Sequence, residues 1–516
     1  MCKKKLFSIL ALAIAIGALA GCGNKASENT EGSDNTYEVA TVRWSDWGED
    51  YHVGFPDDAA KEVGIDLKWD TILNSDWGDQ KGVVLAGGDL PDAYLGSNCF
   101  SESDITMNAG TFIALDDYID EYMPNFKAIM ESDSTMKALA TSADGHIYGL
   151  PSKKPCRPTV ANQMFINKTW LDNLGLEMPT TYTEFADVLK AFKEQDANGN
   201  GDPNDEIPYG QGYADIVMFF CLPFGTTLGA DGTSTLTVKD GNPVFIPTSD
   251  SYKEGIKWMN QCYNEGLIDS EVFTQDTSMR DAKLMNETPI VGVAPGWTAD
   301  ATFGANADQY EALPALVGPD GNAYISSDPE HWNYARYEFV VTSACKDPGK
   351  LLSWIDKFYT DDASIQNFYG SFGIGTEKDG DNYTVLAPKD GESADTYAWI
   401  HSLRDFGPKY VEDGFNDRVT YAAENGDAAK LKLDEELKQY AGEAYPNVSY
   451  TAEQLSTLAT LYADISAYVT STQAAWVTEG GVDEQWDSYI DQLNQMGFEE
   501  FMQIQTDAYN KYMASK

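Results

Sequence analysis

Residues 65–96 read IDLKWDTILNSDWGDQKGVVLAGGDLPDAYLG, and this stretch decides the fold. Its first part, 65–69, alternates apolar and polar side chains, as a half-buried strand does. A helical pattern follows over 76–86, and a second strand is expected over 92–96. Another short β-prone run lies ahead of them at 37–43. Strands that alternate with helices are typical of a parallel sheet, so the sequence predicts an α/β fold.

The same two patterns recur along the chain. Thr181 and Glu184 fit a capping box, in which a hydroxyl and a carboxylate satisfy the free amides of a helix start. The helix that follows carries an apolar face made of Phe185, Val188, Leu189 and Phe192. Strands are expected over 235–238, 289–293 and 339–342, a helix over 351–359, and two C-terminal helices with apolar faces at Trp486, Ile490 and Leu493 and at Phe501, Ile504 and Ala508.

The charge of the chain excludes several classes of partner. The 516 residues hold 35 Lys and Arg against 82 Asp and Glu, a net charge of −47. Phosphate would repel such a chain, so no nucleic acid is expected as a partner. Five of the seven cysteines lie beyond residue 22 without CxxC spacing, so buried thiols are expected rather than a disulfide framework or a zinc site.

Residues 1–21 have the pattern of a secretory signal peptide. Lys3 to Lys5 precede an apolar run that is too short to span a membrane. The run ends in Leu19-Ala20-Gly21-Cys22, which looks like a bacterial lipobox, although an ordinary signal peptide with a chance cysteine is the alternative. The thiol of Cys22 would carry the lipid (a diacylglyceryl group, with acyl chains such as palmitate), and residues 22–36 read as a flexible tether. The expected location is therefore extracytoplasmic, anchored by lipid to the cell membrane.

Several longer stretches resemble a known family. They include Gly88-Asp89-Leu90-Pro91-Asp92, residues 144–151 (DGHIYGLP), residues 166–176 (INKTWLDNLGL) and the helix that begins after Pro179. In this order, and with the lipobox, they resemble the extracellular solute-binding proteins of bacterial ABC importers, in the large lipoprotein branch of the carbohydrate-binding group.

The resemblance implies an architecture and partners. It implies two α/β lobes with a ligand cleft between them, two or three crossing segments, and extra C-terminal helices. The corresponding boundaries are 37–160 for the first part of the N-terminal lobe, 161–345 for the C-terminal lobe, and 346–516 for crossing segments and helices shared between the lobes. The partners implied are a carbohydrate ligand and the permease subunits of the transporter, and a monomer is expected.

Residues 196–206 (DANGNGDPNDE) resemble an EF-hand calcium loop. Oxygen-bearing side chains stand at loop positions 1, 3 and 5, and Gly201 stands at position 6, where the sharp turn needs it. The loop departs from the pattern at position 12, which is Ile207. A structural Ca²⁺ is the hypothesis and an Asx-rich turn without an ion is the alternative. The candidate ligands are Asp196, Asn198, Asn200, Asp202, Asn204, Asp205 and Glu206.

Aromatic side chains stand near the ends of the expected strands. Sugars stack their C–H faces on Trp and Tyr, and their hydroxyls bond to planar polar side chains. The candidate ligand-binding residues are Trp44, Asp46, Trp47, Trp77, Asn98, Trp297, Trp332 and Tyr334. Four other tryptophans fall inside helical patterns and are expected in the core: Trp170, Trp258, Trp354 and Trp486.

The function expected from the resemblance and these residues is binding of a carbohydrate, and more specifically an oligosaccharide, for import. Two alternatives stay open. A protein of the same fold could bind a peptide or another amino compound, or the chain could be a surface glycoside hydrolase. No GxSxG, SxxK or P-loop motif is present, and the number of carboxylates alone identifies no catalytic pair. An enzyme is therefore not expected.

Overall fold

The strands expected within residues 37–96 run parallel to one another in the first sheet. The structure is a computed structural model that describes residues 35–516 except 109, 214–215, 227–234, 390–392 and 424. In it, β1 (Thr36–Arg43) pairs in parallel with both β2 (Asp66–Leu73) and β3 (Ala93–Leu95). The predicted signal peptide, Cys22 and nearly all of the tether lie outside the described residues.

One strand of this sheet comes from much later in the chain. The sheet order is β2-β1-β3-β11-β4, in which β11 (Tyr334–Val341) runs antiparallel to β3 and to β4 (Gly149–Lys153). The range 161–345 was expected to form the C-terminal lobe, but β11 returns to the first sheet. The reason is that Phe339, Val340 and Val341 are buried there between two strands.

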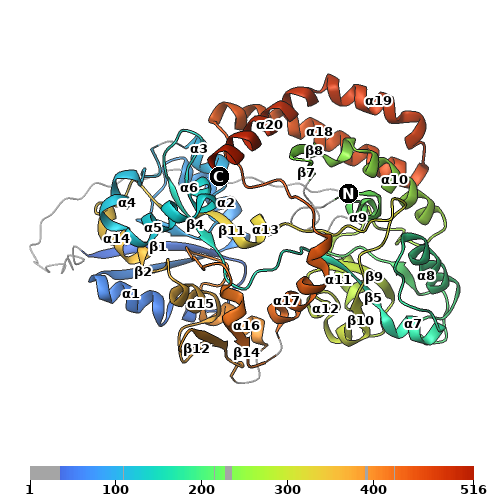
Figure 1. Cartoon of the computed structure of the whole chain (residues 1–516), viewed down its shortest axis with the longest axis horizontal. Coiled ribbons are helices and arrows are strands. Elements are labelled where there is room, and N and C mark those ends of the chain that lie inside the picture. Colours follow the sequence, from blue (N-terminus) through green and yellow to red (C-terminus); the bar gives the residue numbers. More distant parts are fainter. Residues whose placement is uncertain (1–34, 109, 214–215, 227–234, 390–392, 424) are drawn as a thin grey trace, which may run out of the picture.

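Helices cover both faces of the first sheet, which forms the left-hand lobe in Figure 1. Their apolar sides contribute to a core that includes Phe126, Met136, Leu351 and Trp354. The helices of this lobe are α1 (Phe55–Val63), α2 (Asn74–Leu85), α3 (Glu102–Met107), α4 (Asp116–Tyr122), α5 (Pro124–Ser132), α6 (Ser134–Ala140) and, from later in the chain, α14 (Pro348–Asp356).

The second lobe is built on a sheet with the order β10-β5-β9-β6. Its strands are β5 (Gln163–Asn167), β6 (Ile207–Tyr209), β9 (Val291–Gly296) and β10 (Tyr310–Ala312), and the hairpin of β7 (Leu236–Lys239) and β8 (Asn242–Phe245) lies apart from it. The helices are α7 (Lys168–Leu174), α8 (Tyr182–Glu194), α9 (Ile216–Cys221), α10 (Asp250–Asn264), α11 (Thr277–Leu284) and α12 (Ala299–Phe303).

Helix α8 confirms the prediction made from its capping box. Both reciprocal hydrogen bonds between Thr181 and Glu184 are present, and the four apolar side chains of its predicted face are buried in the core of the second lobe. The five cysteines of the described residues are buried thiols outside any disulfide, as expected.

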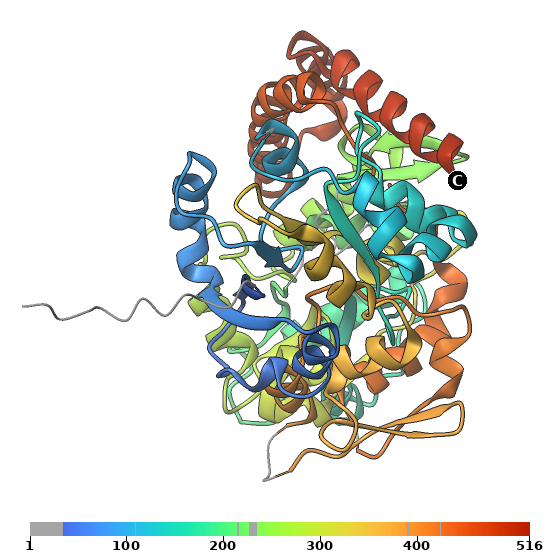
Figure 2. The ribbon, with the colours of Figure 1, turned by 90° about the vertical axis from the view of Figure 1, so that its left-hand side faces the viewer.

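The remaining chain completes both lobes. A third sheet, β12 (Thr376–Asp379), β13 (Asn382–Val385) and β14 (Val419–Tyr421), lies with α15 (Asp361–Tyr369) and α16 (Ala394–His401) on the side of the first lobe. Three helices, α18 (Ala452–Glu479), α19 (Val482–Gln495) and α20 (Phe498–Ser515), pack into the core of the second lobe. Figure 2 shows them as one layer at the top of the molecule, and the end of α20 reaches the first lobe, where Lys511 Nζ donates to the carbonyl of Ala143.

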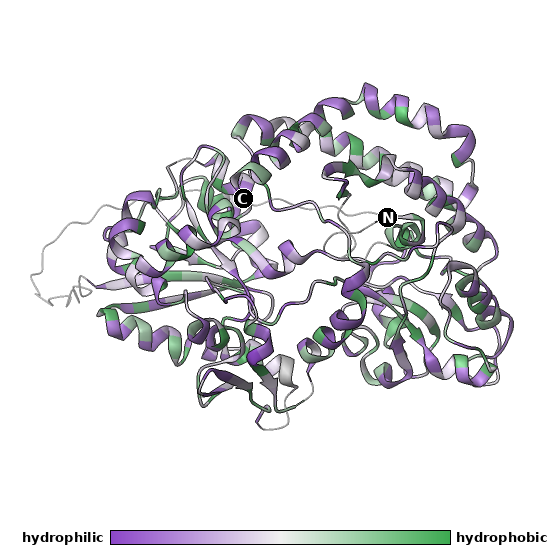
Figure 3. Cartoon of the chain, in the orientation of Figure 1, coloured by the Kyte–Doolittle hydropathy of each residue, from purple (hydrophilic) through white to green (hydrophobic). Residues whose placement is uncertain are grey.

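Three segments cross between the lobes. They are residues 154–162, residues 313–333 with α13 (Pro329–Asn333), and residues 422–451 with α17 (Gly426–Leu437). Figure 1 shows α17 between the two lobes. Within each lobe, hydropathy distinguishes the interior from the surface. The strands inside are mostly hydrophobic (green in Figure 3), and the outer helix faces are largely hydrophilic (purple). Among the described residues, no helix combines the length and apolar character that a membrane span requires.

Candidate ligand-binding site between the lobes

An aromatic cluster lies at the carboxyl end of β1 in the first lobe. Trp44, the first residue after the strand, is 52% exposed, and its ring lies 6.0 Å from that of Phe406. Trp47 is half-buried and stacks on Trp399 of α16, with ring centroids 4.7 Å apart. The cluster therefore presents an accessible indole on a base of packed rings.

The buried side chain of Arg43 packs against this cluster and bonds to the segment that carries Trp399. Its guanidinium lies 4.3 Å from the ring of Tyr51 and 5.5 Å from that of Trp47, and it donates hydrogen bonds to the carbonyls of Trp399 and Ser402. Burial lowers the pKa of Arg43 to about 10. The buried cation fixes two chain segments that are more than 350 residues apart.

A second aromatic pair lies at the end of β9 in the second lobe. Trp297 directly follows the strand, and its ring is 4.7 Å from that of Trp332 in α13. The ammonium of Lys430 lies over the ring of Trp297, 4.5 Å from its centroid. Trp332 Nε1 is buried and has no hydrogen-bond partner in the described part of the chain. Trp297 also lines a cavity of about 470 Å³ with Lys430 and residues of β10 and α17.

Other predicted site residues lie elsewhere. Trp77 is only 3% exposed, and its Nε1 donates to the carbonyl of Cys99 at 2.7 Å, so the structure places it in the core of the first lobe. The reason is that the first turn of α2 points this side chain back at β3. Asn98 is half-buried and donates to the carbonyl of Val42, while its Oδ1 is buried without a partner in the described part of the chain.

The two remaining predicted residues flank the site. Asp46 is exposed and accepts from the backbone of Gly48. Tyr334 opens β11, is half-buried and packs against the core of the first lobe. Of the four tryptophans expected in the core, Trp170 and Trp258 are buried in the second lobe and Trp354 is buried in the first. Trp486 is partly buried against the core of the second lobe.

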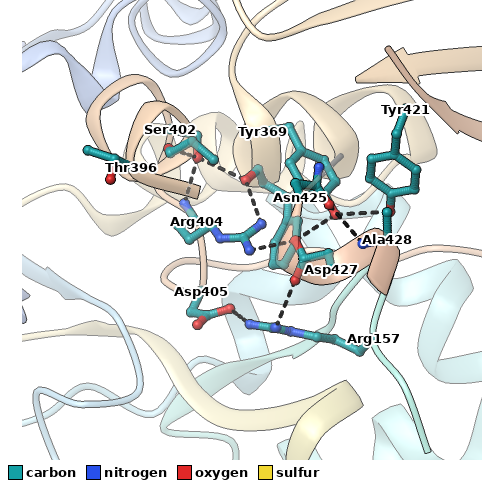
Figure 4. A network of polar contacts seen from close by, with 12 residues as sticks. Arg157, Tyr369, Thr396, Ser402, Arg404, Asp405, Tyr421, Asn425, Asp427 and Ala428 are labelled. Atoms are coloured by element: carbon teal, nitrogen blue, oxygen red, sulfur yellow. Dashed lines mark hydrogen bonds and ion pairs between the residues drawn. The ribbon is translucent and has the colours of Figure 1, made fainter. Parts of the chain in front are cut away.

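A buried ionic network joins the crossing segments, and Figure 4 shows its members. Arg404 Nη2 lies 2.5 Å from Asp427 Oδ2, and Arg157 pairs with both Asp405 and Asp427. Tyr369 donates to the same Asp427 oxygen. Burial alone would raise the pKa of Asp427, but the two guanidinium groups and these hydrogen bonds hold it below its usual range.

A second buried cluster adjoins the end of β3. Glu338 of β11 accepts from the backbone amides of Ser97 and Gly407, and Lys154 Nζ lies 3.8 Å from its other oxygen. Lys409 donates to the carbonyls of Phe406 and Gly407. Burial raises the pKa of Glu338 and lowers that of Lys154 to about 8 and that of Lys409 to about 7.

Helix α17 is fastened directly to the first crossing segment. Asp434 Oδ1 accepts from the backbone amides of Thr159 and Val160, at 2.7 and 2.9 Å. One turn earlier, Lys430 donates to the carbonyl of Ala161, and burial lowers the pKa of this lysine to about 7. Because Lys430 also lies over the ring of Trp297, helix α17, the first crossing segment and the pair of Trp297 and Trp332 pack together.

The calcium-like loop lies away from these clusters, between α8 and β6. Gly201, with φ near +95°, makes the sharp turn, and its amide donates to Asp196. Asp205 accepts from the amides of Asn198 and Asn200, and Glu206 accepts from the backbone of residue 197. No group of three or more His, Cys, Asp or Glu that could hold a metal is found among the described residues.

The loop nevertheless has the chemistry that a hard cation requires. Asp196 Oδ1 and Glu206 Oε2 are buried and have no hydrogen-bond partner, and burial followed by the charge of Asp205 raises the pKa of Glu206. Two buried carboxylate oxygens without donors in an otherwise oxygen-rich loop fit Ca²⁺, whose ligands include Asn and backbone oxygens as well as acids.

Sequence reasoning missed Arg157, Trp399, Arg404 and Phe406. All four lie on irregular segments or on a short helix, where no local period marks them. The dense run of charges and aromatics over 397–410 was the one available signal.

The fold and these sites define a class: a two-lobed binding protein with a ligand cleft between its lobes and additional C-terminal helices. The model of the bacterial extracellular solute-binding proteins matches residues 44–365. The chain belongs to this family, whose members are binding proteins rather than enzymes, in agreement with the sequence prediction.

Comparison with known proteins gives more detailed likenesses. The chain is 33% identical to the fructooligosaccharide ABC transporter substrate-binding protein FusA of Streptococcus pneumoniae, over 88% of this chain and 86% of FusA. It is 24% identical to the lipoprotein LipO of Bacillus subtilis, over 74% of this chain and 77% of LipO.

Solved structures show the same likeness. FusA in complex with kestose matches with a TM-score of 0.76 and 31% identity, over 93% of this chain and 100% of FusA. A FusA EF-hand mutant in complex with fructo-nystose matches with a TM-score of 0.77 at the same identity and coverage. A solute-binding protein from Bifidobacterium longum infantis, described as HMO-binding, matches with a TM-score of 0.79 and 28% identity, over 93% of this chain and 99% of that protein.

Proposed function

We propose that this protein binds an oligosaccharide between its lobes and delivers it to the permease subunits of an ABC importer. The observation that carries the proposal is the placement of one aromatic group at the strand ends of each lobe, around Trp44 in the first and around Trp297 in the second. Indole rings offer flat apolar faces to sugar C–H groups. The sugars named for FusA and for its complexes support the same ligand class.

The mechanism proposed is binding without chemistry. A ligand that contacts Trp44 on one lobe and Trp297 on the other stabilises the closed arrangement more than the open one, and so shifts the population toward closure. Asp427 and Asp434 fasten the first crossing segment to the third, because Asp427 pairs with Arg157 and Asp434 accepts from the amides of Thr159 and Val160. We expect the lobes to move as units about these joined segments.

Thermal-shift measurement against a panel of oligosaccharides and peptides tests the ligand class. An oligosaccharide present at a hundred times its Kd is expected to add about 2.7 kcal/mol to the free energy of unfolding. If peptides stabilise the protein and no oligosaccharide does, the peptide-binding alternative replaces this proposal. Release of reducing ends from an oligosaccharide would instead identify a glycoside hydrolase.

We propose that the protein is held at the outer face of the membrane through Cys22. The lipobox at 19–22 and the polar residues up to 36 support this, as does the likeness to a lipoprotein of Bacillus subtilis. Metabolic labelling with an alkyne analogue of palmitate in a bacterial host tests it. Label on the wild type and none on Cys22→Ala is expected, and equal label on both would refute the anchor.

We propose that the loop 196–206 binds one structural Ca²⁺. The partnerless oxygens of Asp196 and Glu206 support this, and so does the EF-hand named in the FusA mutant structure. Asp196, Asn198, Asn200, Asp205 and Glu206 would hold the ion, with Asp202 and Asn204 at the more exposed side. The ion would offset the charge that the loop concentrates. Calorimetry on chelator-treated protein tests this, and the absence of Ca²⁺ uptake together with an unchanged melting temperature would refute it.

A further inference from the structure

Three arginines on the crossing segments and the two lobes are already engaged by partners of the protein itself. Arg404 and Arg157 share Asp427, and Arg157 also pairs with Asp405. In the second lobe, Arg280 of α11 lies over the ring of Tyr213 and pairs with Asp281 at 2.9 Å. These guanidinium groups are balanced by carboxylates.

The other buried cations of this region bind carbonyl oxygens or lie beside the carboxylate of Glu338. Arg43 donates to two backbone carbonyls, Lys430 donates to Ala161, and Lys409 donates to two further carbonyls. Lys154 lies beside Glu338. Lys409 is buried beside the same Glu338, whose charge opposes the burial that lowers the pKa of this lysine to about 7.

The parts of the chain beyond residue 34 that the structure leaves undescribed add no cation. Residues 109, 214–215, 227–234, 390–392 and 424 contain no Lys or Arg, and the charged residues among them are Asp or Glu. Along the described strand ends, Asp46 and Asp300 are exposed carboxylates. Exposed Lys432 of α17 lines the cavity beside Trp297, but Asp300, Glu311 and Glu436 belong to the same lining. The region between the lobes therefore offers carboxylates in excess, and its buried cations are already engaged by partners.

From this charge arrangement we infer that the site selects neutral oligosaccharides and discriminates against uronates and sulfated sugars, an inference that rests on the proposed function. An anionic sugar would lose its hydration shell without gaining a buried cation that still lacks a partner, and burial of an unpaired charge is costly. It would also face exposed carboxylates, which repel it. A neutral sugar carries neither penalty, and it can stack on the aromatic faces of Trp44 and Trp297 just as an anionic sugar could.

Charge-matched probes test the inference by calorimetry. Neutral trisaccharides (kestose, maltotriose and mannotriose) are compared with anionic ones of the same ring count (trigalacturonate and trimannuronate). We expect at least one neutral trisaccharide to bind, each uronate to bind at least about tenfold more weakly, and the affinity for the neutral ligand to be insensitive to added salt.

The outcomes separate the two claims. Uronate binding as tight as or tighter than that of every neutral sugar would overturn the charge inference and leave the oligosaccharide function standing. If neither set binds and peptides do, the proposed function fails and this inference fails with it.

A variant that removes a carboxylate partner from two arginines tests the same charge selectivity. Asp427→Asn removes the carboxylate that Arg157 and Arg404 share, and is expected to narrow the ratio of uronate Kd to neutral-sugar Kd by about tenfold. Asp356→Asn is the matched control, because Asp356 is equally buried but accepts only from backbone and amide N–H groups of Asn125 and Phe126 in the first lobe. An unchanged ratio in folded Asp427→Asn would overturn the assignment. If that variant does not fold, the wild-type comparison still decides the inference.

Discussion

Lys430 is expected to make the stability of the protein depend on pH in a way that one substitution removes. Its ammonium is buried, donates to Ala161 and lies 4.5 Å from the ring of Trp297. Burial lowers the pKa of Lys430 to about 7, against the opposing effect of Asp434. A lysine in an unfolded chain has a pKa of about 10.4.

The direction of the effect follows from these two values. Between about pH 7 and about pH 10 the unfolded chain holds a proton on this lysine that the folded chain does not, so stability rises with pH. Each pH unit within this window corresponds to about 1.4 kcal/mol, and two units to about 2.7 kcal/mol. Below the folded pKa both states are protonated and the contribution is constant.

Urea unfolding of Lys430→Met at several pH values measures this contribution. Met keeps the apolar stem over Trp297 and removes the titrating group. Between about pH 7 and about pH 9, the free energy of unfolding of the wild type should rise by about 2.7 kcal/mol relative to this variant. Lys432→Met, on the same helix but exposed, is the control and should follow the wild type.

The contributions of other titrating groups to the pH dependence cancel in this comparison, because Lys154 and Lys409 are present in all three proteins. Parallel pH dependences of the wild type and Lys430→Met would refute the reasoning. They would mean that Lys430 keeps its proton in the folded protein throughout, and that α17 does not bury it as the structure indicates.

Three other changes have defined outcomes. Phe192→Ala removes a fully buried ring that lies edge-on to Trp170 at 5.1 Å, and should cost about 3–5 kcal/mol of unfolding free energy in urea; a loss below about 1 kcal/mol would contradict the packing. Asp434→Ala leaves two backbone amides of the first crossing segment without an acceptor, and should cost about 2–6 kcal/mol, with an unchanged urea midpoint speaking against this contact. Asp196→Asn should abolish any rise in melting temperature on adding Ca²⁺, whereas an undiminished rise would place the ion elsewhere.

Local patterns in the sequence predicted much of the architecture, because period and capping are local properties. The alternation at 65–69 became β2, and the capping box at Thr181 became the start of α8. The return of β11 to the first sheet could not be predicted in this way, because its pairing with β3 joins residues that are about 245 positions apart. The lobe boundary expected at 345 was misplaced for that reason.

The same contrast holds for the site. Trp44 and Trp297 were selected because each follows a recognisable strand, and their contact with a ligand stays a prediction. Trp77 has the same sequence context, yet the first turn of its helix directs it into the core. Arg157 and Asp405 could not be paired from sequence, since 248 positions separate them and neither lies in a periodic segment.

Calorimetric titration of the wild type, Trp44→Ala and Trp297→Ala with one neutral oligosaccharide tests the central claim most directly. One tryptophan stands on each lobe, so a ligand held between the lobes should lose about tenfold or more in affinity with either substitution. Far-UV circular dichroism checks that both variants are folded. Wild-type affinity retained in both folded variants, or an absence of binding by the wild type to every neutral oligosaccharide tried, would contradict the account.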